Sequence, residues 1–314
     1  MKRSFFETVR FAAKYAKYYV SHPGFVYRYS KRYSKKFSQS DLEYCVSHIY
    51  EFRLGKKLNL DRVETFNEKL AWLKCFYHDD KMTICADKVT APAYFLEKTG
   101  LDDHYIVRNI GVYDNVDDID FDSLPDSFVL KSNWGSAKQI IVKNKTCADS
   151  KKIKAEMASW LDYKSNHYFD LFEYGYKNII PKIVCEEFIE FDYKIEFFCF
   201  NGKPAYFWTI FGDKTDAVCA DFYDAVSLKK IDLKHGYPNS NTVIQIPKDY
   251  HDMFDIAAKL SKDFPFVRVD FYKTSNGFKF SEMTFYHWGG IMPFEPEQMN
   301  LEFGDRLVLP DKII

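Results

Sequence analysis

Short runs of β-branched and aromatic residues recur along the chain from about residue 128. Such runs are typical of β-strands, because β-branched and aromatic side chains pack well on a pleated sheet surface. The runs are FVLK at 128–131, QIIVK at 139–143, KIVCEEFIE at 182–190, YKIEFFCF at 193–200 and FVRVDFY at 266–272. Helical periodicity occupies 149–162 and 248–262, without a regular βαβ rhythm. The pattern predicts an α+β fold rather than a doubly wound parallel sheet.

Two helices are predicted before these strands. Ser40 and Glu43 have the spacing of a capping box for a helix to about residue 53, which Gly55 would end. Thr65 and Glu68 repeat the spacing for a second helix, which extends to about residue 76. The capping role is a sufficient structural reason for the glutamate in this second box.

Positive charge is concentrated at the N-terminus. Residues 1–36 contain ten Lys or Arg and one acid, a net of +9 that leaves −10 for the other 278 residues. A helical wheel places Phe5, Val9, Ala12, Ala16 and Tyr19 on one face, and Arg3, Arg10, Lys14 and Lys17 on the other. Such a helix either lies on an anionic membrane surface or packs its apolar face on the protein body. No nucleic-acid-binding motif accompanies the charge, so nucleic acid is not a predicted partner.

Cysteine spacing and hydropathy indicate the cellular compartment. The seven cysteines form no CxxC pair and are odd in number, which argues against a zinc site and against a closed disulfide framework. No uncharged apolar run approaches 18 residues, and charged residues interrupt the N-terminal segment where a signal peptide would be apolar. We therefore expect a cytoplasmic protein, with peripheral attachment to the inner membrane face as one use of the basic segment.

A loop of small residues separates the first two predicted strands. Gly135, Ser136 and Ala137 follow the strand that ends near Lys131. Backbone N–H groups in such a loop can hydrogen-bond phosphate oxygens, and a lysine at the strand end adds positive charge. The segment is either a phosphate-binding loop or a plain hairpin.

Two pairs of polar residues lie on neighbouring predicted strands near the C-terminus. Because side chains alternate, Arg268 and Asp270 share one face, as do Glu282 and Thr284 on the next strand. A two-residue turn at 276–277 would pair position 270 with 283, whereas a three-residue loop at 275–277 pairs 270 with 282. Only the longer loop brings the two carboxylates together, and we expect that loop.

Asp270 and Glu282 form the candidate metal site. Two carboxylates opposite each other on adjacent strands repel unless a cation lies between them, and such ligands suit Mg²⁺ that also binds nucleotide phosphates. The alternative is a structural ladder of salt bridges in which Arg268 neutralises both acids. The residues alone leave both interpretations open.

Eight sequence segments together resemble those of a known family. They are TFNEKLAWLK (65–74), DK (87–88), LPDSFVLKSNWGS (124–136), DYK (192–194), FFCFNGKP (197–204), HGYPNS (235–240), FPFVRVDFY (264–272) and EMTFY (282–286). In this order they resemble the TupA-like ATP-grasp family, whose members commonly belong to teichuronopeptide, capsule and other polysaccharide gene sets. The similarity extends from about residue 65 to the C-terminus.

The resemblance implies an ATP-grasp fold in which ATP lies between two α+β lobes. Lys88 and Lys131 would reach the phosphates, and the loop at 135–137 would close over them. Asp192 would lie near the ribose and Lys194 near the phosphates. The adenine would meet the backbone of a hinge formed by Glu186, Glu187, Phe188 and Ile189.

The resemblance also implies the catalytic roles. Arg268, Lys131 and Lys194 would stabilise charge during phosphoryl transfer, while Asp270 and Glu282 would hold magnesium. Many ATP-grasp enzymes end the metal motif with Glu-x-Asn. This chain has Thr284 in the last position, which would supply a weaker ligand or only a water contact.

A second departure lies just downstream. Related sequences often contain Pro-Gly-Ser-Gly where this chain has HWGG at 287–290. We expect this stretch to face the acceptor substrate, with His287 as a candidate contact.

The resemblance implies an ATP-dependent carboxylate–amine ligase that forms an amide through an acylphosphate. The substrate would be a small molecule or a polysaccharide-linked group, such as a uronic acid or amino acid of a bacterial surface polysaccharide. An ATP-grasp sugar kinase shares every nucleotide-site residue, and a glycosyltransferase is a further alternative. The predicted organisation is a basic helical region (1–60), an N-terminal subdomain (61–125), an ATP-binding lobe (126–190) and a C-terminal lobe with the metal site (191–314).

Overall fold

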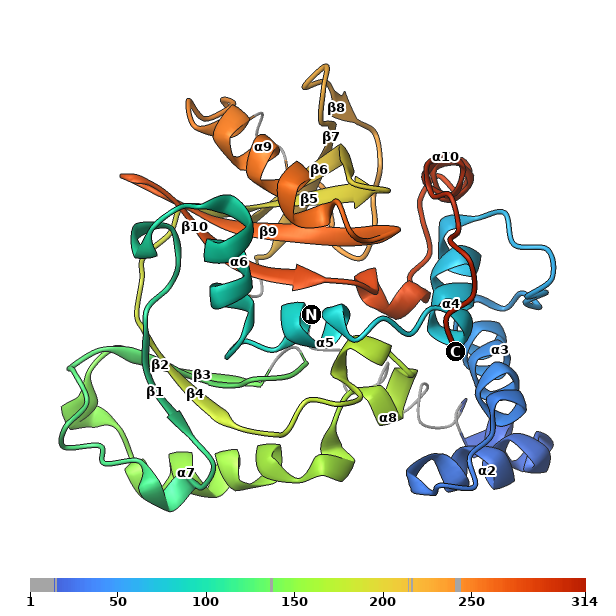
Figure 1. The fold of residues 1–314 in the computed structure, drawn as a ribbon, viewed down its shortest axis with the longest axis horizontal. Helices are drawn as coiled ribbons and strands as arrows, with labels where there is room; N and C mark the ends of the chain where they lie inside the picture. Colours follow the sequence, from blue (N-terminus) through green and yellow to red (C-terminus); the bar gives the residue numbers. More distant parts are fainter. Residues whose placement is uncertain (1–13, 15, 136–137, 214, 216, 241–243) are drawn as a thin grey trace.

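Two antiparallel sheets form the body of the protein (Figure 1). The computed structural model describes residue 14 and residues 16–135, 138–213, 215, 217–240 and 244–314. The smaller sheet has the order β1-β4-β2-β3, with β1 Asn109–Tyr113, β2 Phe128–Ser132, β3 Gln139–Val142 and β4 Ile183–Glu187. The larger sheet has the order β10-β9-β5-β6-β7-β8, with β5 Tyr193–Phe200, β6 Lys203–Phe211, β7 Cys219–Asp224, β8 Lys230–Ile231, β9 Phe266–Thr274 and β10 Gly277–Thr284.

Helices cover the sheets and extend the body at one side. They are α2 Pro23–Ser30, α3 Gln39–Leu54, α4 Phe66–Phe76, α5 Lys81–Ala86, α6 Ala91–Thr99, α7 Ser150–Ala158, α8 Tyr168–Leu171, α9 Tyr250–Ser261 and α10 Gln298–Arg306. Short 3₁₀ turns are Lys31–Tyr33, Asp103–Tyr105, Val116–Asp118, Lys145–Cys147, Ser159–Leu161, Tyr163–Ser165, Tyr174–Tyr176 and His287–Gly290. Helix α7 lies on the smaller sheet and α9 on the larger one, while α5 and α6 lie between the sheets (Figure 1).

Each sheet has its own apolar core. Leu130 and Ile183 of the smaller sheet pack with Met157 and Trp160 from the helical segment beside it. The core of the larger sheet is rich in phenylalanine and continues into the N-terminal helices. The predicted α+β class is confirmed, and each of the five apolar runs forms a strand. The proposed division at residue 125 stays a prediction; β1, which precedes it, pairs with β4.

One of the two predicted capping boxes is present, and the other lies two residues away from its predicted position. Thr65 and Glu68 form the predicted capping box of α4. The predicted box at Ser40 is wrong, because Ser38 has the extended backbone of a cap and exchanges hydrogen bonds with Asp41. Helix α3 therefore begins two residues earlier, and Gly55 ends it in the left-handed conformation as expected.

Part of the basic N-terminal segment packs on α3. Residues 16–21 are helical, and the predicted apolar and basic faces at residues 1–13 lie outside the described part of the chain. The Lys14 Nζ donates to the Phe52 carbonyl at 3.1 Å and the Tyr18 hydroxyl contacts His48 Nδ1 at 2.7 Å. Lys14 is exposed, as its place on the basic face predicts, although its Nζ reaches α3; Ala16, expected in the apolar face, is exposed as well. Among the described residues, no helix is long and apolar enough to span a bilayer.

Candidate active site

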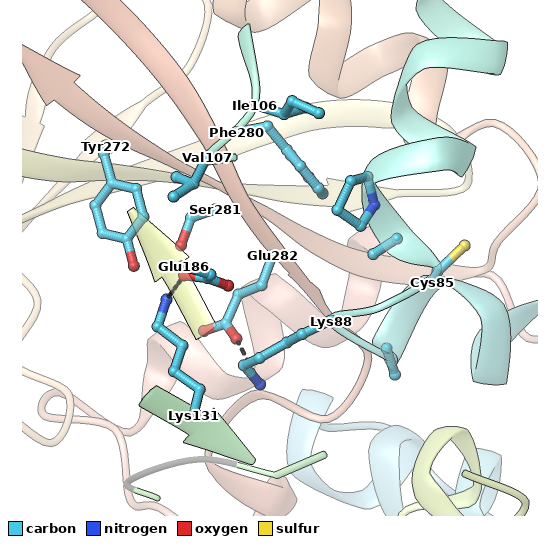
Figure 2. Close-up of a pocket in the computed structure, with 13 residues that line it drawn as sticks. Cys85, Lys88, Ile106, Val107, Lys131, Glu186, Tyr272, Phe280, Ser281 and Glu282 are labelled. Carbon is cyan, nitrogen blue, oxygen red and sulfur yellow. Dashed lines mark hydrogen bonds and ion pairs between the residues drawn. The ribbon is translucent and has the colours of Figure 1, made fainter. Parts of the chain in front are cut away.

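A pocket lies where the two sheets face each other (Figure 2). Lys131 of β2 and Glu186 of β4 come from the smaller sheet, and Tyr272 of β9 and Glu282 of β10 from the larger one. Lys88, just after α5, completes the polar wall. The apolar wall includes Ala86, Pro92, Ile106, Val107 and Phe280. The pocket combines charge at one side with a surface that an aromatic base can contact.

Lys131 is held as a charged group inside the pocket. Its side chain is 13% exposed and forms an ion pair with Glu186. Burial disfavours the ammonium form, but the neighbouring Tyr272 and Glu186 outweigh it and raise the pKa of Lys131 above its ordinary value. The lysine therefore carries a full positive charge at neutral pH, as a phosphate-binding residue requires.

Lys88 joins the pocket to the small-residue loop. Its Nζ donates to the Gly135 carbonyl at 3.0 Å and lies 3.7 Å from Glu282 Oε2. Gly135 has a φ of +69°, a left-handed conformation that glycine adopts without strain. Ser136 and Ala137 lie outside the described residues, and the phosphate-binding role of the loop at 135–137 stays a prediction.

The β9–β10 hairpin pairs Asp270 with Glu282, as predicted, but by another route. Thr274 pairs with Gly277, so the turn has two residues and not the expected three. The register then shifts between Phe280 and Glu282, which is the signature of a β-bulge. The bulge adds the residue that the shorter turn lacks, so Asp270 and Glu282 occupy paired positions.

Arg268 lies at the centre of a buried charge network. Its guanidinium donates to both Asp270 carboxylate oxygens, at 2.8 and 2.6 Å, and its Nε lies 2.8 Å from Glu196 Oε2. The indole Nε1–H of Trp208 donates a hydrogen bond to the same Glu196 oxygen at 2.6 Å. Burial raises the pKa of Asp270 above its ordinary value, although the guanidinium of Arg268 opposes this shift. Arg268 also donates to Thr284 Oγ1 at 3.2 Å. The Asp270 half of the salt-bridge ladder is therefore present, whereas Glu282 forms an ion pair with Lys88.

The predicted hinge leaves the smaller sheet beside the pocket. Of its residues, Glu186 lines the pocket, whereas the backbone N–H of Glu187 donates to the Arg108 carbonyl at 3.0 Å. Lys143 lies 5.7 Å from the Phe188 ring centre, and Ile189 is half-buried. The contact between this hinge and adenine stays a prediction.

Lys194 and Asp192 lie at the start of β5. Lys194 is 7% exposed and its Nζ lies 2.9 Å from Asp213 Oδ2 and 5.2 Å from the Tyr272 ring centre. It is thus adjacent to the pocket wall, while Asp192 is exposed and its N–H donates to the Lys273 carbonyl at 2.8 Å. The phosphate and ribose roles of these two residues stay predictions.

Two residues of this constellation were missed in the sequence. Glu196 pairs with Asp270 across β5 and β9, and Tyr272 lies two residues beyond Asp270 on the same face. A glutamate inside the otherwise apolar run of β5 was the available signal for the first. The tyrosine gave no signal, because the chain has 23 of them.

The model of the TupA-like ATP-grasp family matches residues 68–308. The chain belongs to this family. The resemblance inferred from the sequence motifs is confirmed, and with it the ATP-grasp fold class. A search of curated proteins finds no match to the chain.

Solved structures of ATP-grasp proteins are similar at low identity. The ATP-grasp ligase PsnB, complexed with a phosphomimetic variant of its minimal precursor, Mg and ADP, is 11% identical with a TM-score of 0.41; the match covers 69% of this chain and 57% of PsnB. D-alanine–D-alanine ligase from Bacillus anthracis, complexed with ATP, is 16% identical with a TM-score of 0.38 and coverages of 69% and 56%. The ADP complex of N5-carboxyaminoimidazole ribonucleotide synthetase is 13% identical with a TM-score of 0.41 and coverages of 79% and 57%. The chain therefore matches a little over half the length of each of these three proteins.

The acidic residues of this TupA-like ATP-grasp protein fit a magnesium ion. Asp270, Glu282 and Thr284 offer hard oxygen donors, and Mg²⁺ needs only one or two protein carboxylates when substrate phosphates supply further ligands. Glu282 is the accessible member, with its side chain 34% exposed in the pocket. The described residues contain no group of three or more His, Cys, Asp or Glu arranged for a metal. Magnesium binding by Asp270, Glu282 and Thr284 stays a prediction.

Proposed function

We propose that the protein is an ATP-dependent carboxylate–amine ligase. The observation that carries the proposal is the pocket between the sheets, where Lys131, Lys88 and Glu282 converge beside Arg268 and Asp270 in a chain of the ATP-grasp family. Phosphoryl transfer depends on positioning and on cations around developing negative charge, rather than on a protein nucleophile. Lysines, an arginine and magnesium-binding carboxylates supply these requirements.

In the proposed reaction, a substrate carboxylate oxygen attacks the γ-phosphorus of ATP, which forms an acylphosphate and releases ADP. An amine then attacks the acyl carbon, which forms the amide and releases phosphate. Lys131 and Lys88 bind phosphate oxygens, and Arg268 stabilises charge on the transferred group. Magnesium, when bound by Glu282 and Asp270, would neutralise charge on the bridging phosphates. The proposed substrate is a uronic acid or amino acid component of a bacterial surface polysaccharide.

The product distinguishes the ligase from its alternatives. Incubation with ATP, magnesium, candidate uronic acids and amines should yield ADP, phosphate and an amide mass. ADP with a phosphorylated sugar would instead identify a sugar kinase. A glycosyltransferase is disfavoured because all strand pairs within the two described sheets are antiparallel, whereas that alternative predicts a parallel sheet.

Lys131→Met should lower ADP formation by about 10²- to 10³-fold, because it removes a charge aimed at the phosphates. The variant should keep its far-ultraviolet circular dichroism spectrum. Lys154→Met, at a surface lysine of α7, is the matched control and should retain wild-type turnover. Wild-type turnover in Lys131→Met would contradict the nucleotide site.

We further propose that the basic N-terminal region binds an anionic membrane surface. No Asp or Glu occurs between residues 8 and 40. Val20 and Tyr27 are 84% and 67% exposed, and Lys17, Lys35 and Lys36 are exposed on the same segment. Exposed apolar side chains among lysines suit the boundary between lipid headgroups and acyl chains. Lipid-linked intermediates of polysaccharide assembly would then lie within reach.

Lys35→Gln combined with Lys36→Gln should weaken binding to vesicles that contain phosphatidylserine. Each basic residue near such a surface contributes about 1 kcal/mol, so the expected loss is roughly thirty-fold at low salt. Lys151→Gln combined with Lys152→Gln removes two adjacent exposed lysines from α7 and should have no effect. Co-sedimentation measures both, and an equal affinity of the two double variants would defeat the membrane proposal.

A further inference from the structure

The turn after β10 is held against α4 by close backbone packing. Trp288, Gly289 and Gly290 all have positive φ values, of 49°, 62° and 65°. A Cβ on Gly290 would lie 2.9 Å from Leu70 Cβ, so a side chain there would push the turn off the helix. The left-handed turn and its contact with α4 therefore depend on each other.

Two polar side chains of α4 bind the backbone of this turn. Lys74 Nζ donates to the Gly289 carbonyl at 2.8 Å, and Asn67 Nδ2 donates to the Met292 carbonyl at 2.9 Å. Both residues are buried, at 3% and 1% exposure. Helix α4 thus binds two carbonyl groups of the turn, those of residues 289 and 292.

The burial of Lys74 is costly, so its presence calls for an explanation. Desolvation lowers the pKa of Lys74 to about 8, although the nearby Glu173 opposes the shift. Its Nζ also lies 5.8 Å from the Tyr286 ring centre. An apolar residue would fill a helix–loop contact without the desolvation penalty of an ammonium group. What the lysine provides, and an apolar residue would not, is a directed hydrogen bond to the Gly289 carbonyl.

The turn begins at His287, which contacts the proposed catalytic arginine. His287 is 1% exposed, and its Nδ1 lies 2.7 Å from Arg268 Nη1. A guanidinium has only donors, so Nδ1 accepts and the proton of this imidazole resides on Nε2. The ring packs edge-on against Phe198 and Trp208, with centroids 4.7 and 5.0 Å away. His287 therefore limits the positions that the guanidinium can occupy.

We propose that Lys74 is a positioning residue, which acts through the turn at 287–292 and His287 to hold Arg268 towards the transferred phosphoryl group. The role of Arg268 in this inference rests on the proposed function. The contacts from Lys74 through the turn and His287 to Arg268 do not depend on that function. Asn67 has the same role at the other end of the turn. Helix α4 contributes no residue to the pocket in Figure 2, and yet it would position a group of the phosphoryl site.

The chain offers a matched control on the same helix. Lys69 Nζ donates to the Gly304 and Leu307 carbonyls, both at 2.8 Å, and so ties α4 to the end of α10 instead of the turn. Lys74→Met and Lys69→Met each remove one ammonium group and its bonds to main-chain carbonyls. A purely structural role for Lys74 predicts similar behaviour of the two variants.

The first measurement is a long-range ¹H–¹⁵N spectrum of the histidine rings, with the His287 signals assigned by their loss in His287→Gln. Wild type and Lys69→Met should show His287 protonated at Nε2 with Nδ1 accepting a hydrogen bond. Lys74→Met should shift the Nδ1 signal towards that of a free imidazole. An unchanged His287 signal in Lys74→Met would overturn the proposal, whether or not the protein is a ligase.

The second measurement compares MgADP with MgADP plus aluminium fluoride, a mimic of the transferred phosphoryl group. In Lys74→Met the affinity for MgADP should stay within about two-fold of wild type. The increase in affinity that aluminium fluoride produces should fall by about 10- to 100-fold, because the catalytic group is misplaced. Lys69→Met should retain the full gain. An undiminished gain in Lys74→Met would overturn the positioning role. Absence of MgADP binding by wild type would instead contradict the proposed function.

Asn67→Ala provides the same test if Lys74→Met does not fold. It removes the bond to Met292 without leaving a buried acid unpaired. The same loss of the aluminium fluoride gain is expected, together with a shifted His287 signal. Retention of both wild-type properties in this variant would overturn the proposal that α4 positions the turn.

Discussion

Glu282→Gln should lower ATP-dependent turnover by about 10²- to 10³-fold, equivalent to roughly 2.7–4 kcal/mol of transition-state stabilisation. The substitution keeps the shape of the side chain and removes the charge that would bind magnesium. Glu282 faces the pocket on β10, opposite Asp270 of β9. Both Asp270 oxygens accept hydrogen bonds from Arg268 and Asp270 is fully buried, whereas the Glu282 side chain is 34% exposed, so Glu282 is the more accessible carboxylate. Turnover is followed as ADP formation.

The same substitution should leave the fold intact. The Glu282 side chain is 34% exposed and lies 3.7 Å from Lys88, so the expected change in the free energy of unfolding is less than about 1 kcal/mol. Magnesium and ATP together should raise the melting temperature of the wild type clearly, and that of Glu282→Gln much less. Glu297→Gln, at an exposed ion pair with Lys56, is the control and should behave as wild type. A sharp loss of stability with normal turnover would instead favour the salt-bridge ladder as the whole role of Glu282.

Arg268→Met should lower the free energy of unfolding by about 3–5 kcal/mol, in addition to abolishing turnover. Asp270 and Glu196 are 0% and 2% exposed, and the substitution would leave both buried near each other without the cation that balances them. Removing one partner of a buried ion pair is costly because the remaining charge stays desolvated. Urea unfolding measures the loss.

A surface ion pair provides the comparison for Arg268. Lys98 lies 2.8 Å from Asp263, but the two side chains are 36% and 27% exposed, so Lys98→Met should cost less than about 1 kcal/mol. Combining Arg268→Met with Asp270→Asn should recover part of the stability, because one buried charge is then removed. If Arg268→Met lowers the free energy of unfolding by less than about 1 kcal/mol, the arginine does not compensate the buried carboxylates.

Local sequence patterns determined the elements and their chemistry. Runs of β-branched and aromatic residues identified the five strands, and Thr65 with Glu68 marked the start of α4, because these signals depend on neighbours within a few residues. The motif order identified the family without any structural information. At Ser40 even the local signal misled, since Ser38 with Asp41 offers the same chemistry two residues earlier.

Only the tertiary structure decided which of these residues meet. Asp270 opposes Glu282 because a bulge compensates for a turn one residue shorter than expected, and a single-residue shift would have moved one carboxylate to the other face. Glu196 reaches Arg268 from a strand some seventy positions away, and Lys74 reaches the turn at 287–292 across more than two hundred. Such contacts depend on sheet order and helix packing, which no local periodicity encodes. The sequence by itself therefore determined the family and the strands, whereas packing between distant segments determined which charged side chains meet and which partners hold them.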